Sequence, residues 1–157
     1  MIILDVEASG LHEDSYPIQV AWLNTETGEE DSFYIKPEEE WTYWDINAED
    51  IHNIPRKLLD DVGIPADLAV KRLLTSFGKK ADIYTDAPDF DGFWLSKLFG
   101  AVLVDPDVNI KVHSVYEVCE FKEDFYALQE VMHNQERPHD ALEDCRMIWR
   151  AIQEVIG

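Results

Sequence analysis

Two carboxylates lie two residues apart near the start of the chain, at Asp5 and Glu7. The surrounding segment Met1 to Val6 is rich in Ile and Leu, which predicts a strand buried on both faces. Side chains two apart on a strand point to the same face, so both anions would meet there. Because anions that lose hydration together need a proton, a basic partner or a metal ion, the pair indicates either a cation site or a solvated strand end.

A second acidic cluster lies in the middle of the chain, where Asp86, Asp89 and Asp91 occur close together. The cluster follows a predicted strand at Ala81 to Thr85 and opens a predicted helix at Phe90 to Phe99. Carboxylates at the start of a helix also cap its free N–H groups and interact with the helix dipole. The cluster therefore provides either further cation ligands or a helix cap.

The third cluster combines carboxylates with a histidine near the end of the chain. His139 begins the last predicted helix, His139 to Ile156, and Asp144 follows within its first turns. At the helix start, the ring of His139 can swing over a site into which Asp144 points. An imidazole exchanges protons near neutral pH, so it can accept a proton from water. Asp140 and Glu143 are expected to stabilise the helix start.

A turn of small residues follows the first carboxylate pair. Ala8, Ser9 and Gly10 have little side-chain bulk, so another molecule can approach the backbone there. Leu11 follows them as an apolar residue that we expect to be exposed. The turn is therefore a candidate contact for a ligand bound at the carboxylates.

The elements that must position these residues follow an α/β pattern with a mixed central sheet flanked by helices. The strand at Met1 to Val6 is expected at the centre of the sheet, and a second segment, Pro37 to Asp61, is expected to be an ordered excursion with short helical patches. The remaining predicted elements are a hairpin of strands at Pro17 to Leu23 and Ser32 to Lys36, a helix at Pro65 to Phe77, a strand at Asn109 to Val115 and a helix at Val115 to His133.

Length and composition indicate one packed domain over residues 1–157, since 46% of the residues are hydrophobic and the chain has 5 Trp, 6 Tyr and 7 Phe. Only Cys119 and Cys145 are cysteines, too few for a disulfide framework. No apolar stretch approaches the length of a membrane span or a signal segment. We therefore expect a cytoplasmic protein that does not enter a membrane.

The formal net charge of −20 argues against a protein that coats duplex nucleic acid through a broad basic face. It leaves room for a small site that takes one end of a strand. Long strands should be repelled, so short oligonucleotides are the expected substrates. The cations that we expect to contact phosphate are Arg56, Lys57, Lys71, Arg72, Lys79 and Lys80.

Taken in order, the three clusters resemble the three motifs of the DEDDh 3′–5′ exonucleases, the family of ribonuclease T, oligoribonuclease and proofreading exonuclease subunits. The matching segments are Asp5-x-Glu7 with Ser9-Gly10-Leu11, Phe90-Asp91-x-x-Trp94-Leu95, and His139 followed by Asp144. They cover nearly the whole chain, and their combination is more specific than any one of them.

The resemblance implies a ribonuclease H-like fold and a metal-dependent 3′–5′ exonuclease. In such an enzyme two Mg²⁺ or Mn²⁺ ions and a general base, His139, release nucleoside 5′-monophosphates from the 3′ end. The residues implied as metal ligands are Asp5, Glu7, Asp91 and Asp144. Hard oxygen ligands suit these ions, and two such ions can stabilise both the attacking water and the leaving oxygen.

The resemblance also implies contacts to the substrate. Leu11 is similar to the apolar wedge beside the terminal base, and Ala8 and Ser9 would face the terminal ribose. Ala8 stands where the family commonly has Thr, so no side-chain hydroxyl is offered there. Asp86 stands where the family often has His, so Asp86 or Asp89 could replace Asp91 as the ligand, or Asp86 could assist in substrate binding.

The expected partner is the 3′ end of single-stranded nucleic acid, with RNA favoured over DNA by analogy with the small free-standing members of the family. Two alternatives remain open, a proofreading-like exodeoxyribonuclease and a catalytically weak module that binds nucleic acid or protein. A homodimer is also possible on this analogy, with Trp41, Tyr43 and Trp44 as candidates for its interface.

Overall fold

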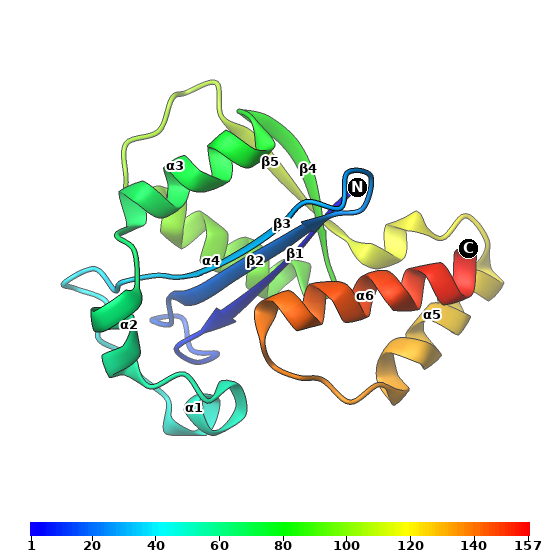
Figure 1. The fold of residues 1–157 in the computed structure, drawn as a ribbon, viewed down its shortest axis with the longest axis horizontal. Helices are drawn as coiled ribbons and strands as arrows, with labels where there is room; N and C mark the ends of the chain where they lie inside the picture. Colours follow the sequence, from blue (N-terminus) through cyan, green and yellow to red (C-terminus); the bar gives the residue numbers. More distant parts are fainter.

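A mixed five-stranded sheet forms the centre of the fold, in a computed structural model that describes residues 1–157 (Figure 1). The strands are β1 Ile2–Ala8, β2 Pro17–Asn24, β3 Glu30–Tyr34, β4 Lys80–Thr85 and β5 Asn109–Ser114. They lie in the order β3-β2-β1-β4-β5, with β2 antiparallel and β4 parallel to β1. The central place of β1 and the β2–β3 hairpin confirm two predictions from the sequence.

Helices cover both faces of this sheet (Figure 1). Their bounds are α1 Ile46–His52, α2 Arg56–Val62, α3 Ala66–Phe77, α4 Pro88–Gly100, α5 Lys122–Asn134 and α6 Ala141–Ile156. α3 and α4 pack on one face, whereas α6 packs on the other with α5 beside it. This arrangement confirms the predicted α/β class. None of the helices has the length and apolar character needed to cross a membrane.

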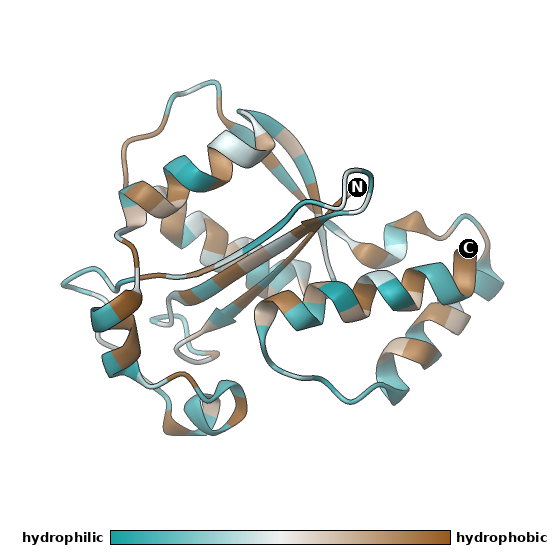
Figure 2. Ribbon diagram, in the orientation of Figure 1, coloured by the Kyte–Doolittle hydropathy of each residue, from teal (hydrophilic) through white to brown (hydrophobic).

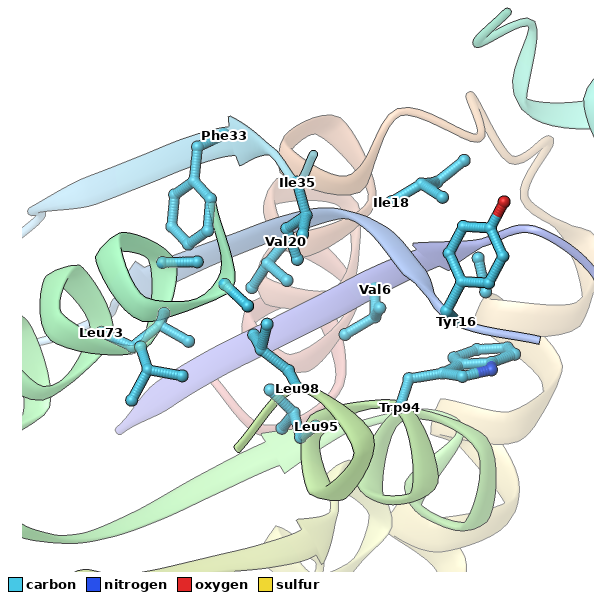
Figure 3. Close-up of a cluster of buried hydrophobic side chains, with 14 of the residues drawn as sticks. Val6, Tyr16, Ile18, Val20, Phe33, Ile35, Leu73, Trp94, Leu95 and Leu98 are labelled. Carbon is cyan, nitrogen blue, oxygen red and sulfur yellow. The ribbon is translucent and has the colours of Figure 1, made fainter. Parts of the chain in front are cut away.

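Alternation along β1 divides the core into two clusters. Leu4 and Val6 pack with residues of α3 and α4, and Figure 3 shows Val6 facing Leu95 and Leu98 of α4. Ile3 packs against α6 in the second cluster. Full burial of an aliphatic side chain stabilises a fold by about 2 kcal/mol. Figure 2 shows hydrophobic and hydrophilic residues interspersed along the helices, as expected for elements with one buried face.

The predicted helix from Val115 to His133 is wrong in one respect, because it is two elements. A short 3₁₀ turn at Val115–Val118 comes first, and α5 begins only at Lys122. Ser114 and Glu117 form a capping box on the short turn, and the backbone is extended at Cys119. The capping box starts a turn that the extended backbone then ends.

The segment from Pro37 to Asp61 contains α1 and the start of α2, which confirms the predicted helical patches. Asp45 caps α1 by accepting a hydrogen bond from the Asn47 N–H at 2.9 Å. β3 ends earlier than predicted, at Tyr34; Ile35 still donates to the backbone oxygen of Ile18 at 2.9 Å and forms an isolated parallel bridge with Ile64. α1 thereby lies near the turn that follows β1, which matters for the site described next.

Candidate active site

Three separate segments bring acidic side chains to the carboxyl end of β1. Asp5 and Glu7 lie two apart on β1, Asp91 lies in the first turn of α4, and Asp144 lies in the first turn of α6. β4 runs parallel to β1, so the start of α4 follows β4 to the same end of the sheet. The four carboxylates named from the motifs are therefore neighbours in the fold.

The candidate ligand atoms form two adjoining groups. One contains Glu7, His139 and Asp144, and the other contains Asp5, Asp86 and Asp91. Within each group, one ligand atom from each residue lies within 4.8 Å of the others. Every residue that the sequence named as a metal ligand or base belongs to one of the two groups.

Burial and mutual repulsion disfavour the ionised form of these carboxyls. Burial raises the pKa of Asp5 well above its usual range, and the charges of Asp91 and Glu7 raise it further. Burial, followed by the charges of Asp144 and Asp91, raises the pKa of Glu7 from 4.5 to about 8. Burial also raises the pKa of Asp91 from 3.8 to about 7 and raises the pKa of Asp144. A bound cation would reverse these shifts by favouring the ionised carboxylates.

Buried oxygens without hydrogen-bond partners mark where such a cation would bind. Asp5 Oδ2, Asp86 Oδ1 and Asp144 Oδ1 are all buried and unpaired. Unpaired buried polar atoms are rare, because each costs about 1–3 kcal/mol. Carboxylate oxygens are the ligands that Mg²⁺ and Mn²⁺ prefer. The residues present therefore fit a divalent cation site.

Within the second acidic cluster, Asp91 turns inward and Asp89 does not. Asp91 is 2% exposed, whereas Asp89 is exposed and belongs to neither group. The Thr85 hydroxyl donates to Asp91 and accepts from the Ala87 N–H at 3.1 Å, which fixes the carboxylate. The alternative use of this cluster as a helix cap is wrong, because Ala87 occupies the N-cap position of α4 and no side chain caps the helix.

His139 lies in the connection between α5 and α6, one residue before the N-cap of α6. That N-cap is Asp140, whose Oδ1 accepts from the Glu143 N–H at 3.1 Å, which confirms the structural role expected of Asp140. Gln19 on β2 fixes the same point by donating to Asp140 Oδ2 at 3.2 Å and accepting from the Ala141 N–H at 3.2 Å. The helix start is thereby tied to the sheet, and His139 lies beside Glu7 and Asp144.

Arg137 is a residue of this site that the sequence reasoning missed. Its guanidinium forms an ion pair with Asp86 and lies close enough to lower the pKa of Glu7, Asp91 and Asp144, against the larger effect of burial. A signal was present in the sequence, since Arg137 is the only Lys or Arg between Lys122 and Arg146 and lies two positions before His139. It is the one cation in an otherwise acidic site.

A cavity of about 240 Å³ adjoins the carboxylates between β1 and α1. Glu7, Ala8 and Leu11 line it from one side, and Leu11 is 72% exposed, as expected for a residue that meets a ligand. Ser9 is fully buried, and its hydroxyl accepts from the Tyr16 N–H at 3.1 Å. Its hydroxyl therefore shapes the turn from inside. His52, which the sequence reasoning also missed, lines the opposite side of the cavity.

Of the six cations predicted to contact phosphate, three have partners within the chain and three are exposed lysines. Arg56 donates to the backbone oxygen of Trp41 at 3.0 Å, and Arg72 forms an ion pair with Asp31 at 2.6 Å. Lys79 also forms an ion pair. The remaining three, Lys57, Lys71 and Lys80, are exposed. The two arginines therefore brace the fold rather than standing free for a substrate.

The aromatic residues considered for a dimer interface have partners within the chain. Trp41 is buried and stacks on Tyr16 with ring centroids 5.6 Å apart, and Tyr43 stacks on His12 at 4.9 Å. Trp44 packs edge-on against the imidazole ring of His52 in α1. Packing inside one chain accounts for all three, and a homodimer stays a prediction.

No protein-family model and no curated protein matches the chain. Solved structures of exonuclease I do match it. A complex of E. coli exonuclease I with a dA16 oligonucleotide has a TM-score of 0.73 and 19% identity over 95% of this chain and 39% of that one. A zinc-bound complex of the E. coli enzyme with single-stranded DNA has a TM-score of 0.72 and 19% identity over 96% and 39%.

A moderately thermophilic exonuclease I from Methylocaldum szegediense has a TM-score of 0.73 and 16% identity over 98% of this chain and 40% of that one. The chain therefore spans about two fifths of the length of the exonucleases it matches. The similarity covers the whole sheet and the helices on both of its faces. The chain has the ribonuclease H-like fold of exonuclease I, as its sequence motifs predict.

Proposed function

We propose that the protein is a metal-dependent 3′–5′ exonuclease that removes nucleoside 5′-monophosphates from single-stranded nucleic acid. One observation carries the proposal, namely that Asp5, Glu7, Asp91, Asp144 and His139 converge on one end of β1. They come from three distant parts of the chain. The shared fold of the exonuclease I structures supports the same activity.

Asp5 and Asp91 would hold one divalent cation, and Glu7 and Asp144 would hold a second. When bound, such ions lower the pKa of water and stabilise the charge that develops on the leaving 3′ oxygen. Mg²⁺ and Mn²⁺ are the expected metals, because every proposed ligand is a carboxylate oxygen. The unpaired oxygens of Asp5 and Asp144 support this assignment.

His139 is proposed as the general base. It lies in the same group as Glu7 and Asp144, at the edge of the site, where it can take a proton from the attacking water. Gln19 and the cap of α6 hold the segment next to it.

The cavity beside Glu7 is proposed to take the terminal nucleotide. Leu11 offers an apolar contact to the last base, and Trp94 and Ile51 add apolar lining. Ala8 presents no hydroxyl to the ribose, as the sequence indicated. The inward-facing hydroxyl of Ser9 leaves its backbone as the only polar contact that it could offer.

Single-stranded DNA is the substrate class that the structural neighbours support, since several of them are complexes with single-stranded DNA oligonucleotides. The preference for RNA expected from the sequence rests on analogy alone, and a direct comparison of the two sugars is needed. The net charge of −20 favours short strands in either case.

The test uses 5′-labelled short single-stranded DNA and RNA with Mg²⁺, Mn²⁺ or chelator, and the variants Asp5→Ala, His139→Ala and Asp89→Ala. The expected result is a metal-dependent ladder that shortens from the 3′ end, is lost in Asp5→Ala and is slowed strongly, to a small residual rate, in His139→Ala. Asp89→Ala is the matched control, since Asp89 is an exposed carboxylate outside both groups, and it should retain activity. Absence of cleavage with either metal would refute the proposal.

A further inference from the structure

The segment that carries His139 is an irregular connection between α5 and α6, from Gln135 to Asp140. Two contacts anchor it to the rest of the fold. On the side toward α6, Gln19 binds Asp140 through a hydrogen bond of 3.2 Å. On the side toward α5, Arg137 forms its ion pair with Asp86. His139 lies between these anchors, so both of them determine where its ring can be.

The Asp86–Arg137 pair is partly shielded from water. The Asp86 side chain is 13% exposed and the Arg137 side chain 32%. A partly buried ion pair of this kind is not easily replaced by solvent, and loss of one partner leaves the other charge uncompensated. The pair is therefore a firmer local constraint than a more exposed ion pair such as Lys79–Asp105, whose side chains are 59% and 41% exposed.

The pair also joins the two halves of the site. Asp86 follows β4 and lies with Asp5 and Asp91 in one ligand group. Arg137 lies two residues before His139, which belongs to the other group. The contact spans 51 positions of sequence and connects the loop before α4 to the segment before α6. A shift of either loop would therefore be transmitted to the other.

The backbone of His139 adds a reason for a firm anchor. Its φ is 55°, in the left-handed region that residues other than glycine seldom adopt. Such a conformation persists only where the surrounding structure fixes it. The anchors at Arg137 and Asp140 lie on either side of this residue.

We propose that Arg137 is a positioning residue, whose ion pair with Asp86 holds the segment from Gln135 to Asp140 so that His139 stays against Glu7 and Asp144. The inference rests on the proposed exonuclease function. Arg137 acts through His139 and does not contact the substrate in this view. It pairs with Asp86 and with none of the four proposed metal ligands, Asp5, Glu7, Asp91 and Asp144.

The first test measures hydrogen–deuterium exchange of the full chain with Mg²⁺ and compares Arg137→Gln with the wild type. The expected result is faster exchange confined to peptides that cover residues 135–140. Arg146→Gln is the matched control, since it removes ion pairs with Glu30 and Glu143, both outside residues 135–140, and should leave that segment unchanged. Unchanged exchange of the segment in Arg137→Gln would overturn the proposal, whether or not the protein is an exonuclease.

The second test is a double-mutant cycle of Arg137→Gln with His139→Ala. Misplacement of a catalytic group by about 1 Å can cost about 100-fold in rate, so Arg137→Gln should lower kcat by about 10- to 100-fold with little change in KM. In the His139→Ala background it should cause no further loss, because the group that it positions is already absent. Arg137→Lys should recover part of kcat, because it keeps the charge.

The outcomes separate the possible roles of Arg137. A loss of the same factor in both backgrounds would show that Arg137 acts independently of His139 and would overturn the proposal. A rise in KM with unchanged kcat would assign it to a substrate phosphate and would overturn the proposal as well. If the wild-type protein shortened no strand, the exonuclease function would fail, and the exchange measurement would still decide whether Arg137 anchors the segment.

Discussion

Asp5 is the residue at which stability and function oppose each other most directly. It is 6% exposed, one of its oxygens has no hydrogen-bond partner, and the charges of Asp91, Glu7 and Asp144 all act on it. In the metal-free protein an ionised Asp5 is repelled by its neighbours and poorly hydrated, which raises its pKa. The same crowding is what gives a divalent cation several oxygens at once. In the metal-free protein, the crowded carboxylates therefore lower the free energy of unfolding.

Replacement of Asp5 by Asn should stabilise the metal-free protein at pH 8. The amide has nearly the same shape as the carboxylate but carries no charge, so the repulsion is removed without opening a cavity. We expect a higher Tm than the wild type in chelator, by about 2–4 °C for each kcal/mol gained at this chain length. The increase in Tm on addition of Mg²⁺ should shrink, and the exonuclease activity should disappear. Asp89→Asn serves as the control, and an equal gain in both variants would contradict the explanation.

The stability of the metal-free protein should depend on the pKa of Glu7. Burial is the main cause that raises this pKa from 4.5 to about 8. As the pH rises above 4.5 the unfolded chain loses the proton while the folded protein keeps it, so the free energy of unfolding falls until about pH 8 and then levels off. The measurement is Tm in chelator from pH 4.5 to 8.5 for the wild type and Glu7→Gln. The Gln variant should show a smaller decline, and parallel profiles would refute the assignment.

The residues proposed to bind metal or take a proton could be named from the sequence, whereas Arg137, proposed to position one of them, could not. Asp5, Glu7 and Asp91 lie on or next to predictable elements, so their convergence followed from the motifs. The role of Arg137 depends on a contact with Asp86 across 51 positions, which no local pattern encodes. The position of Arg137 near His139 is visible in the sequence, but only the fold shows that its partner is Asp86.

At the level of elements, the sequence predicted the helices and strands that have a regular buried face. It missed boundaries that depend on particular hydrogen bonds. The strand at Pro17–Asn24 and the helix at Ala66–Phe77 have the spacing of buried faces and lie where they were expected. The break between Val118 and Lys122 is set by the capping box at Ser114, which periodicity does not register. Beyond the end of β3, Ile35 forms a bridge with the distant residue Ile64, which periodicity does not register either.

Gly63, at the end of α2, tests how closely this helix packs against the segment that follows β3. A side chain at Gly63 would have its Cβ 2.5 Å from the backbone nitrogen of Lys36 and too close to the backbone oxygen of Leu59. Because backbone atoms cannot move aside as flexible side chains do, Gly63→Ala should destabilise the protein by about 1–3 kcal/mol. Urea unfolding measures this. Gly100→Ala is the control, since nothing lies within 4 Å of its Cβ, and a similar loss in both variants would contradict the packing argument.

For the whole molecule, the distribution of charge bears on the choice of substrate. The chain has 33 Asp and Glu against 13 Lys and Arg, and the candidate site uses only a few of these acids. Arg72 and Arg146 are already paired with carboxylates. Because the acids outnumber Lys and Arg by 20, the field around the molecule repels polyanions. Binding must come mainly from the strand end itself.

This charge predicts an unusual dependence on salt. Proteins that bind nucleic acid through a basic face lose affinity as salt increases, because the release of condensed counterions into a saltier solution gains less free energy. Here the dominant long-range interaction is repulsion, which salt screens over a Debye length of about 10 Å at 0.1 M. At fixed Mg²⁺ we expect kcat/KM to rise as KCl increases from low to moderate concentration, and to rise more steeply for long strands, because more of their phosphates meet the repulsive field. The measurement compares a short and a long single strand with the same 3′ end across a KCl series. A fall in kcat/KM with salt for both strands would show that a cationic surface controls binding, and the exposed lysines Lys57, Lys71 and Lys80 would then be the residues to replace first.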